Sequence, residues 1–322
     1  MIFMNILQKG SLLDREKLLA MSAALVLFAV LSATNPNTFL SSYNIGTLLD
    51  YATTYFIAAV GLTFVILIGS IDLSLGSMLS LFTVIFIMML NSLGYWAFPL
   101  IIFIGVAFGF LNGFVFTGLK IPSFIGTFGA AGVLSSLALI ISGGKPIGIN
   151  PKMLPKLEFL TFQIGPLKGS HLLGFALFVI FLIIQNFTTF GKYVYAIGNS
   201  EQATKLSGIR VARTKTLCFA LSGLSAALAA VVLVSRMLSG DPTIGTPYQL
   251  QIIATVVVGG TALSGGTGGI FNTLLGTFII VFVGNGMYVA GVNVYYQQII
   301  TGIITMFAVA ATLDRTKVKI VK

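Results

Sequence analysis

The sequence predicts an all-α, polytopic integral membrane protein with about ten transmembrane helices, and three observations support this fold class. Apolar side chains make up 57% of the 322 residues and charged side chains only 8%, whereas soluble domains carry roughly 25% charged residues. The mean hydropathy is +1.02, which excludes a water-soluble globule. Apolar runs of the length that crosses hydrocarbon recur along the whole chain. The ten runs cover residues 17–34, 45–68, 73–90, 96–118, 123–142, 171–187, 215–235, 249–264, 269–289 and 294–312.

The first run, at residues 17–34, is interpreted as a retained span. Five charged residues between positions 9 and 17 precede it, and no A-x-A-like cleavage site clearly follows residues 32–37. A secretory signal peptide, which is removed after export, is the alternative interpretation.

The second and third runs are separated by the segment GSIDLSLG at residues 69–76. A carboxylate such as that of Asp72 costs several kcal/mol at bilayer depth unless it meets water, a partner or backbone N–H groups. The surrounding glycines and serines suit a broken helix whose freed backbone lines a cavity or the protein interior. The same residues also suit a tight turn near the surface that Asp72 would N-cap. If the helix is broken, Asp72 and Ser74 are candidates for lining an internal path.

The fourth run carries Gly105, Gly109 and Gly113 at four-residue spacing on one helix face, which predicts close packing against another helix. The amides of Asn112 in this run and of Asn285 in the ninth run suit either a neighbouring helix or a hydroxylated solute. The aromatic ring of Phe64 in the second run suits either core packing or stacking on the CH face of a sugar.

Two hydrophilic stretches interrupt the runs, at residues 143–170 and 190–214. The first is rich in proline and glycine and is expected to be external. The second is basic and lacks proline, and residues 201–206 are on the whole good helix formers, closed by Gly208 as a C-cap. We therefore expect a short cytoplasmic helix in the second stretch.

The distribution of basic residues predicts the orientation. The chain has 18 Lys and Arg against 8 Asp and Glu, a formal net charge of +10. If the N-terminus is cytoplasmic, 13 of the 18 basic residues fall in cytoplasmic segments, which favours both termini inside. Membrane topology thereby explains the positive charge, and nucleic acid is not expected as a partner.

Residues 259–269, GGTALSGGTGG, contain six glycines but lack the GK[ST] ending of a phosphate loop, so nucleotide binding is rejected. A structural turn and a short broken helix both fit, since the apolar stretch before the glycines is too short to span the membrane alone. Four residues of 69–76 recur at a fixed offset of 190 in 259–266, and Asn112 and Gly113 recur as Asn285 and Gly286. These echoes predict two related halves, which are common in transporters.

Cys218 is the single cysteine, His171 is the single histidine, and the chain has no CxxC or HExxH motif. Disulfides, the usual zinc sites and redox chemistry are therefore not expected. No clustered set of catalytic side chains is visible for a membrane enzyme. An ion-coupled carrier usually needs carboxylates or histidines within the membrane, and only Asp72 and Asp50 qualify.

Three segments together resemble the permease subunits of bacterial sugar ABC importers of the ribose type. They are GLTFVILIGSIDLSLGS at 61–77, YAIGNSEQATKLSGI at 195–209 and ATVVVGGTALSGGTGG at 254–269. The resemblance covers nearly the whole chain. Two departures occur: Ser70 replaces a glycine that the family usually has, and one residue is missing between Gly198 and Asn199. The second departure puts in doubt the docking geometry of the loop that contains Gly198 and Asn199, which the family uses to bind its ATPase.

The resemblance implies a single transmembrane permease domain over residues 1–322 in the bacterial cytoplasmic membrane, in contact with membrane lipid. It also implies a second permease copy or paralogue, an extracytoplasmic sugar-binding protein and cytoplasmic ABC ATPases. Since those ATPases hold ATP and Mg²⁺, this chain is expected to be no enzyme and to need no cofactor or metal of its own. The family's coupling loop, which docks on the ATPase, falls on Gly198, Asn199, Glu201, Ala203, Thr204, Leu206, Ser207, Gly208 and Ile209.

The expected function is alternating-access import of a monosaccharide, either a pentose or a hexose with ribose as the first candidate. A neutral solute is expected because the predicted spans contain few ionisable groups. An ion-coupled secondary sugar carrier is the alternative. The candidate residues of the translocation path are Asp72, Ser74, Asn112, Asn285 and Phe64.

Overall fold

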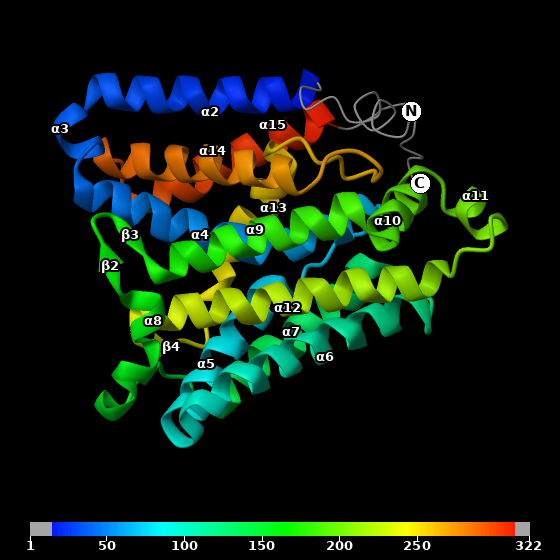
Figure 1. The fold of residues 1–322 in the computed structure, drawn as a ribbon, viewed down its shortest axis with the longest axis horizontal. Coiled ribbons are helices and arrows are strands. Elements are labelled where there is room, and N and C mark those ends of the chain that lie inside the picture. Colours follow the sequence, from blue (N-terminus) through cyan, green and yellow to red (C-terminus); the bar gives the residue numbers. More distant parts are fainter. Residues whose placement is uncertain (1–14, 313–322) are drawn as a thin grey trace.

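The computed structural model describes residues 15–312 and is built almost entirely of α-helices (Figure 1). Short antiparallel pairs join β1 (Ile147–Gly148) to β4 (Ser239–Gly240) and β2 (Gln163–Ile164) to β3 (Leu167–Lys168). The helices are α2 (Arg15–Thr34), α3 (Pro36–Phe39), α4 (Ser42–Leu67), α5 (Leu75–Leu93), the 3₁₀ turn η1 (Gly94–Trp96), α6 (Ala97–Thr117), α7 (Ser123–Ser142), the 3₁₀ turn η2 (Pro151–Leu157), α8 (Glu158–Thr161), α9 (Gly169–Phe187), α10 (Thr189–Asn199), α11 (Glu201–Leu206), α12 (Val211–Met237), α13 (Gly245–Val258), α14 (Ile270–Val289) and α15 (Val294–Thr312).

Seven segments of the described chain are long and apolar enough to cross a membrane. One of them, Leu75–Thr117, contains both α5 and α6, whereas the 14 residues of α13 are fewer than a span needs. The all-α, polytopic fold is therefore confirmed. Length and composition identify seven candidate spans among the described residues, so they do not confirm the predicted count of about ten. α7 and α15 coincide with the runs 123–142 and 294–312, whereas α13 begins earlier and ends earlier than the run 249–264.

The long helices lie side by side, and the short elements gather at two opposite ends (Figure 1). The predicted loop 143–170 contains β1, η2, α8 and the β2–β3 hairpin; this end is called the α8 end. The other end carries α10 and α11 and is called the α11 end. The two hydrophilic stretches of the sequence therefore lie at opposite ends of the bundle.

α12 lies in the core of the bundle, where it packs on α4, α5 and α6. The glycines of α6 face α12, which confirms the predicted close helix contact. A side chain at Gly109 would collide with the backbone of Phe219, and a Cβ at Gly105 would lie only 2.6 Å from the carbonyl oxygen of Gly223. Because no side chain fits in that space, glycine is what allows the two backbones to approach so closely.

Two breaks interrupt helices inside the bundle. The first break, residues 68–74, joins α4 to α5, and the second break, residues 259–269, joins α13 to α14. The breaks touch, since a Cβ at Gly265 in the second break would lie only 2.7 Å from the backbone nitrogen of Gly69 in the first. Beside this contact, the N–H of Gly266 donates a hydrogen bond of 2.9 Å to the carbonyl oxygen of Leu67, the last residue of α4. The two segments that echo one another in sequence therefore both interrupt a helix, and they meet in space.

The short helix expected within residues 190–214 is present as α11, which covers the predicted residues 201–206. The hydroxyl of Ser200 accepts a hydrogen bond from the N–H of Ala203 at its start. Gly208 follows its end with φ near +80°, a conformation that favours glycine. The sequence analysis missed α10, although its buried residues Val194 and Ile197 recur at helical spacing.

Candidate functional site

The first break places Asp72 inside the protein, where its side chain is fully buried. Its Oδ1 accepts hydrogen bonds from the backbone N–H of Ser74 at 3.0 Å and from the Ser74 hydroxyl at 2.6 Å. Its Oδ2 accepts one from the hydroxyl of Ser222 on α12 at 2.9 Å. No cation pairs with Asp72 among the described residues, so these donors replace its hydration. The surface turn N-capped by Asp72 is wrong, because the carboxylate is inaccessible and Ser74 is the N-cap of α5.

The network extends from the first break to α6. The side-chain amide of Asn112 donates a hydrogen bond of 2.8 Å to the hydroxyl of Ser74. Ser222 lies eleven residues into α12, so the network is about 17 Å from the start of that helix. Three residues predicted for a solute path, Asp72, Ser74 and Asn112, thus form one hydrogen-bonded network deep inside the bundle.

Side chains of other helices satisfy the backbone of the first break. The N–H of Ile71 donates to the hydroxyl of Ser123 at 3.3 Å, and the N–H of Leu73 donates to the hydroxyl of Thr127 at 3.0 Å. The side-chain amide of Gln249 on α13 donates a hydrogen bond of 3.4 Å to the carbonyl oxygen of Asp72, and its oxygen accepts one from the N–H of Gly76 in the first turn of α5. Irregular backbone at membrane depth requires such partners. The first break is therefore an ordered segment held by hydrogen bonds to other helices, rather than a frayed helix end.

The other two predicted path residues lie elsewhere. Asn285 of α14 and Asn44 of α4 exchange two amide hydrogen bonds, of 3.1 Å and 2.7 Å. Phe64 is fully buried, and its ring centroid lies 6.0 Å from that of Phe181 and 5.6 Å from that of Phe190. In this conformation both residues bond or pack against neighbouring helices.

The last turn of α10 packs against both breaks. A side chain at Gly198 would collide with the carbonyl oxygen of Leu67, the last residue of α4 before the first break, and with the backbone of Gly266 in the second break. One turn earlier, the hydroxyl of Tyr195 donates a hydrogen bond of 2.7 Å to the carbonyl oxygen of Gly268. Burial raises the pKa of Tyr195 to about 12, so the phenol keeps its proton at neutral pH. The segment that leads to α11 is thus in direct contact with the second break and with the end of α4, where the first break begins.

α11 is anchored at its base and exposed at its tip. The ammonium group of Lys215 on α12 lies 2.7 Å from the carboxylate of Glu201, and Thr204 is buried. Leu206 at the end of the helix is 83% exposed. Of the residues predicted for coupling, the structure brings Gly198 to the breaks and leaves Leu206 at the surface.

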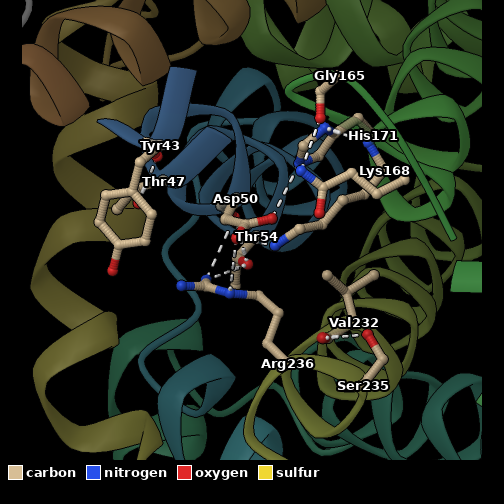
Figure 2. Close-up of polar contacts among 11 residues, drawn as sticks. Tyr43, Thr47, Asp50, Thr54, Gly165, Lys168, His171, Val232, Ser235 and Arg236 are labelled. Carbon is tan, nitrogen blue, oxygen red and sulfur yellow. Dashed lines mark hydrogen bonds and ion pairs between the residues drawn. The ribbon is translucent and has the colours of Figure 1, made fainter. Parts of the chain in front are cut away.

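The sequence analysis did not anticipate a polar cluster at the α8 end (Figure 2). Asp50 of α4 lies 2.6 Å from the ammonium of Lys168, 3.0 Å from Nε2 of His171 and 3.8 Å from Nε of Arg236. The guanidinium of Arg236 also lies over the ring of Tyr51, 4.7 Å from its centroid. The cluster ties the starts of α4 and α9 to the end of α12. Polar residues at the ends of apolar runs were the only sequence signal for it.

The described residues hold no group of three or more His, Cys, Asp or Glu side chains that could bind a metal ion. The second break bonds within the fold: the N–H of Gly269 donates to the hydroxyl of Thr261, and the N–H of Ile270 donates to the side-chain oxygen of Gln185. These N–H groups are engaged by the protein and do not form a phosphate cradle.

A family model described as "Branched-chain amino acid transport system / permease component" matches residues 44–309. Similar curated proteins include the ribose import permease protein RbsC of Bacillus subtilis, 38% identical over 301 residues that cover 91% of this chain and 90% of that protein. RbsC of Haemophilus influenzae is 36% identical over 294 residues, 90% of each chain. The L-arabinose transport system permease protein AraH of Escherichia coli is 33% identical over 321 residues, 96% of this chain and 93% of that protein. No solved structure matches the chain. The chain therefore belongs to this permease family, as a sugar ABC permease of the ribose type.

Proposed function

We propose that this chain is the membrane subunit of an ATP-driven importer that moves a monosaccharide, either a pentose or a hexose of the ribose kind. The names of its relatives support this solute class, since they are permeases for ribose and L-arabinose. The Asp72 network supports a solute without negative charge, because its hydroxyl, amide and carboxylate groups have no cation beside them among the described residues. An extracytoplasmic binding protein delivers the sugar in this proposal.

The contacts of α10 and α11 are the observation that carries the mechanism. An ATPase bound at the exposed tip of α11 moves this helix together with α10, and Gly198 then transmits the displacement to both breaks. Since the first break positions Asp72 and Ser74, the displacement changes the conformation around the proposed path. Nucleotide and binding protein favour different conformers, which is the thermodynamic requirement for alternating access.

The proposal has further parts, which concern orientation, span number and partners. The α11 end faces the cytoplasm with both chain termini, and α13 and α15 complete about ten membrane helices arranged as two related halves. A second copy of this chain or a paralogue forms the other side of the path. ATP and Mg²⁺ bind to the partner ATPase, and the whole chain acts as one permease domain.

The experiment is sugar uptake into proteoliposomes that contain this chain with its candidate ATPase and binding protein. A panel of labelled pentoses and hexoses is tested with and without internal ATP. Uptake that requires ATP and the binding protein is the expected result and identifies the sugar. Uptake that follows an ion gradient without ATP would instead show a secondary carrier.

The coupling contact is tested by Leu206→Asp, with Leu206→Met as the matched control. Burying a leucine side chain contributes about 1.5–3 kcal/mol, so the Asp variant should lower ATP-driven uptake by about tenfold or more. Leu206 is exposed in this chain, so neither substitution removes an internal contact. Unchanged uptake by the Asp variant would show that α11 does not dock on the ATPase through its tip.

A further inference from the structure

A cavity of about 460 Å³ lies at the α11 end, between α10, the turn after α11 and the first turns of α12. Its polar lining includes Arg210, Arg213 and the hydroxyls of Thr189 and Ser207. The contacts of α10 with the breaks do not involve these four side chains. The cavity is therefore distinct from the contacts between α10 and the breaks, although Ser207, Gly208 and Ile209 of the predicted coupling loop also line it.

The cavity is basic and lacks an internal counterion. Arg210 and Arg213 are exposed, and neither forms an ion pair with a carboxylate among the described residues. No side chain caps the first turn of α12, whose helix dipole directs partial positive charge toward the same space. Two guanidinium groups beside an uncapped helix start favour an anion with several oxygen atoms, such as a phosphate group.

The apolar side of the cavity lies at the level where helices enter the membrane. Phe190 follows the end of the candidate span α9 by three residues, and it lines the cavity together with Ile209. Leu217, one to two turns into the candidate span α12, is 41% exposed and continues the lining away from the arginines. A ligand that matches both sides has an anionic head and an apolar tail.

We propose that this cavity binds an anionic phospholipid, with its phosphate against Arg210 and Arg213 and an acyl chain along Phe190 and Leu217. Basic pockets between membrane helices are suited to such headgroups. The proposal rests on the membrane placement of α9 and α12, and it requires neither the sugar nor the ATPase. Because the lipid contacts α10 and α12 together, it holds the α11 segment at the membrane boundary.

The test measures lipid binding to the purified full-length chain by native mass spectrometry. Phosphatidylglycerol and phosphatidylcholine with identical acyl chains are titrated separately. The double variant Arg210→Gln, Arg213→Gln should weaken phosphatidylglycerol binding by about thirtyfold, since each basic residue near the membrane surface raises the affinity by about fivefold. Phosphatidylcholine, in which choline offsets the charge of the phosphate, should bind the unmodified chain more weakly, and its affinity should change less. The matched control Lys145→Gln, Lys152→Gln removes two exposed lysines of the opposite end and should change neither affinity.

Two further measurements distinguish a phospholipid site from a site for a free anion and test the role of positive charge. Inorganic phosphate at millimolar concentration should not displace phosphatidylglycerol; displacement would show a site for a free anion and overturn the lipid assignment. The variant Arg210→Lys, Arg213→Lys keeps both charges and should retain the preference for phosphatidylglycerol. Equal binding of phosphatidylglycerol by the unmodified chain and the Gln variant would refute the site. Since the assay uses this chain alone, its result is independent of ATP-driven uptake.

Discussion

The buried carboxylate of Asp72 makes a sharp prediction, because the same position can be changed with and without loss of its hydrogen-bond acceptors. The variant Asp72→Ala removes the acceptor for the Ser74 N–H, the Ser74 hydroxyl and the Ser222 hydroxyl. The variant Asp72→Asn keeps a side-chain oxygen for Ser74 and presents an NH₂ group that can donate a hydrogen bond to the hydroxyl oxygen of Ser222. The two variants therefore separate hydrogen bonding from side-chain volume.

The magnitude follows from the donors that are left without partners. A buried donor without an acceptor costs about 1–3 kcal/mol. The two hydroxyls can rotate toward backbone carbonyl oxygens, whereas the N–H of Ser74 has no such freedom. We therefore expect Asp72→Ala to lower the free energy of unfolding by about 3 kcal/mol. We expect Asp72→Asn to lower it by about 1 kcal/mol or less, because the amide oxygen keeps an acceptor for the N–H of Ser74.

The assay is unfolding of the purified protein in mixed micelles as the fraction of denaturing detergent rises, followed by helix content and extrapolated to zero denaturant. Two serine variants of α12 serve as controls. Ser222→Ala removes one donor to Asp72 and should cost about 1 kcal/mol, whereas Ser235→Ala removes only a bond to the carbonyl of Val232 on the same helix and should cost less. Equal unfolding free energies for the Ala and Asn variants at position 72 would refute the argument.

The other predictions use the same unfolding assay. Asp50→Asn keeps the shape of the side chain but leaves three basic groups without their carboxylate, so the free energy of unfolding should fall by about 2 kcal/mol. An unchanged value would show that the cluster at the α8 end does not stabilise the fold. Asn44→Ala and Asn285→Ala, alone and combined, should give a coupling energy of about 1–2 kcal/mol, since the two amides bond each other. Additive effects would contradict that pairing.

The sequence predicted the helices well, because an apolar run long enough to cross hydrocarbon has few alternatives to a helix. The run 123–142 coincides with α7, and the basic stretch 190–214 contains α11 at the expected residues. α10 was missed because its glycine, aromatic and polar residues fit no long apolar run. The run 249–264 was placed further along the chain than α13, which covers Gly245–Val258. Valines and glycines follow one another at its end without a charged residue, so hydropathy does not mark where the helix stops.

The candidate site was predicted only in part. Asp72 and Ser74 were identified because a carboxylate among glycines and serines is unusual in an apolar chain, but the sequence left open whether they lie at the surface. The internal echo also gave an incomplete correspondence. Its first part joins the two breaks, whereas Asn112 lies on the second helix after one break and Asn285 on the first helix after the other.

The features that could be predicted from the sequence are those that depend on neighbouring residues along the chain. Residence in a membrane, the helical class, the helix limits and the basic stretch all follow from hydropathy and charge along the sequence. Contacts between distant residues do not, because they depend on how the helices pack. Only the tertiary structure brings Ser222 to Asp72, joins Lys168 and Arg236 around one carboxylate, and sets α10 against both breaks. Those contacts arise because buried polar groups and freed backbone must find partners from other helices where water is absent.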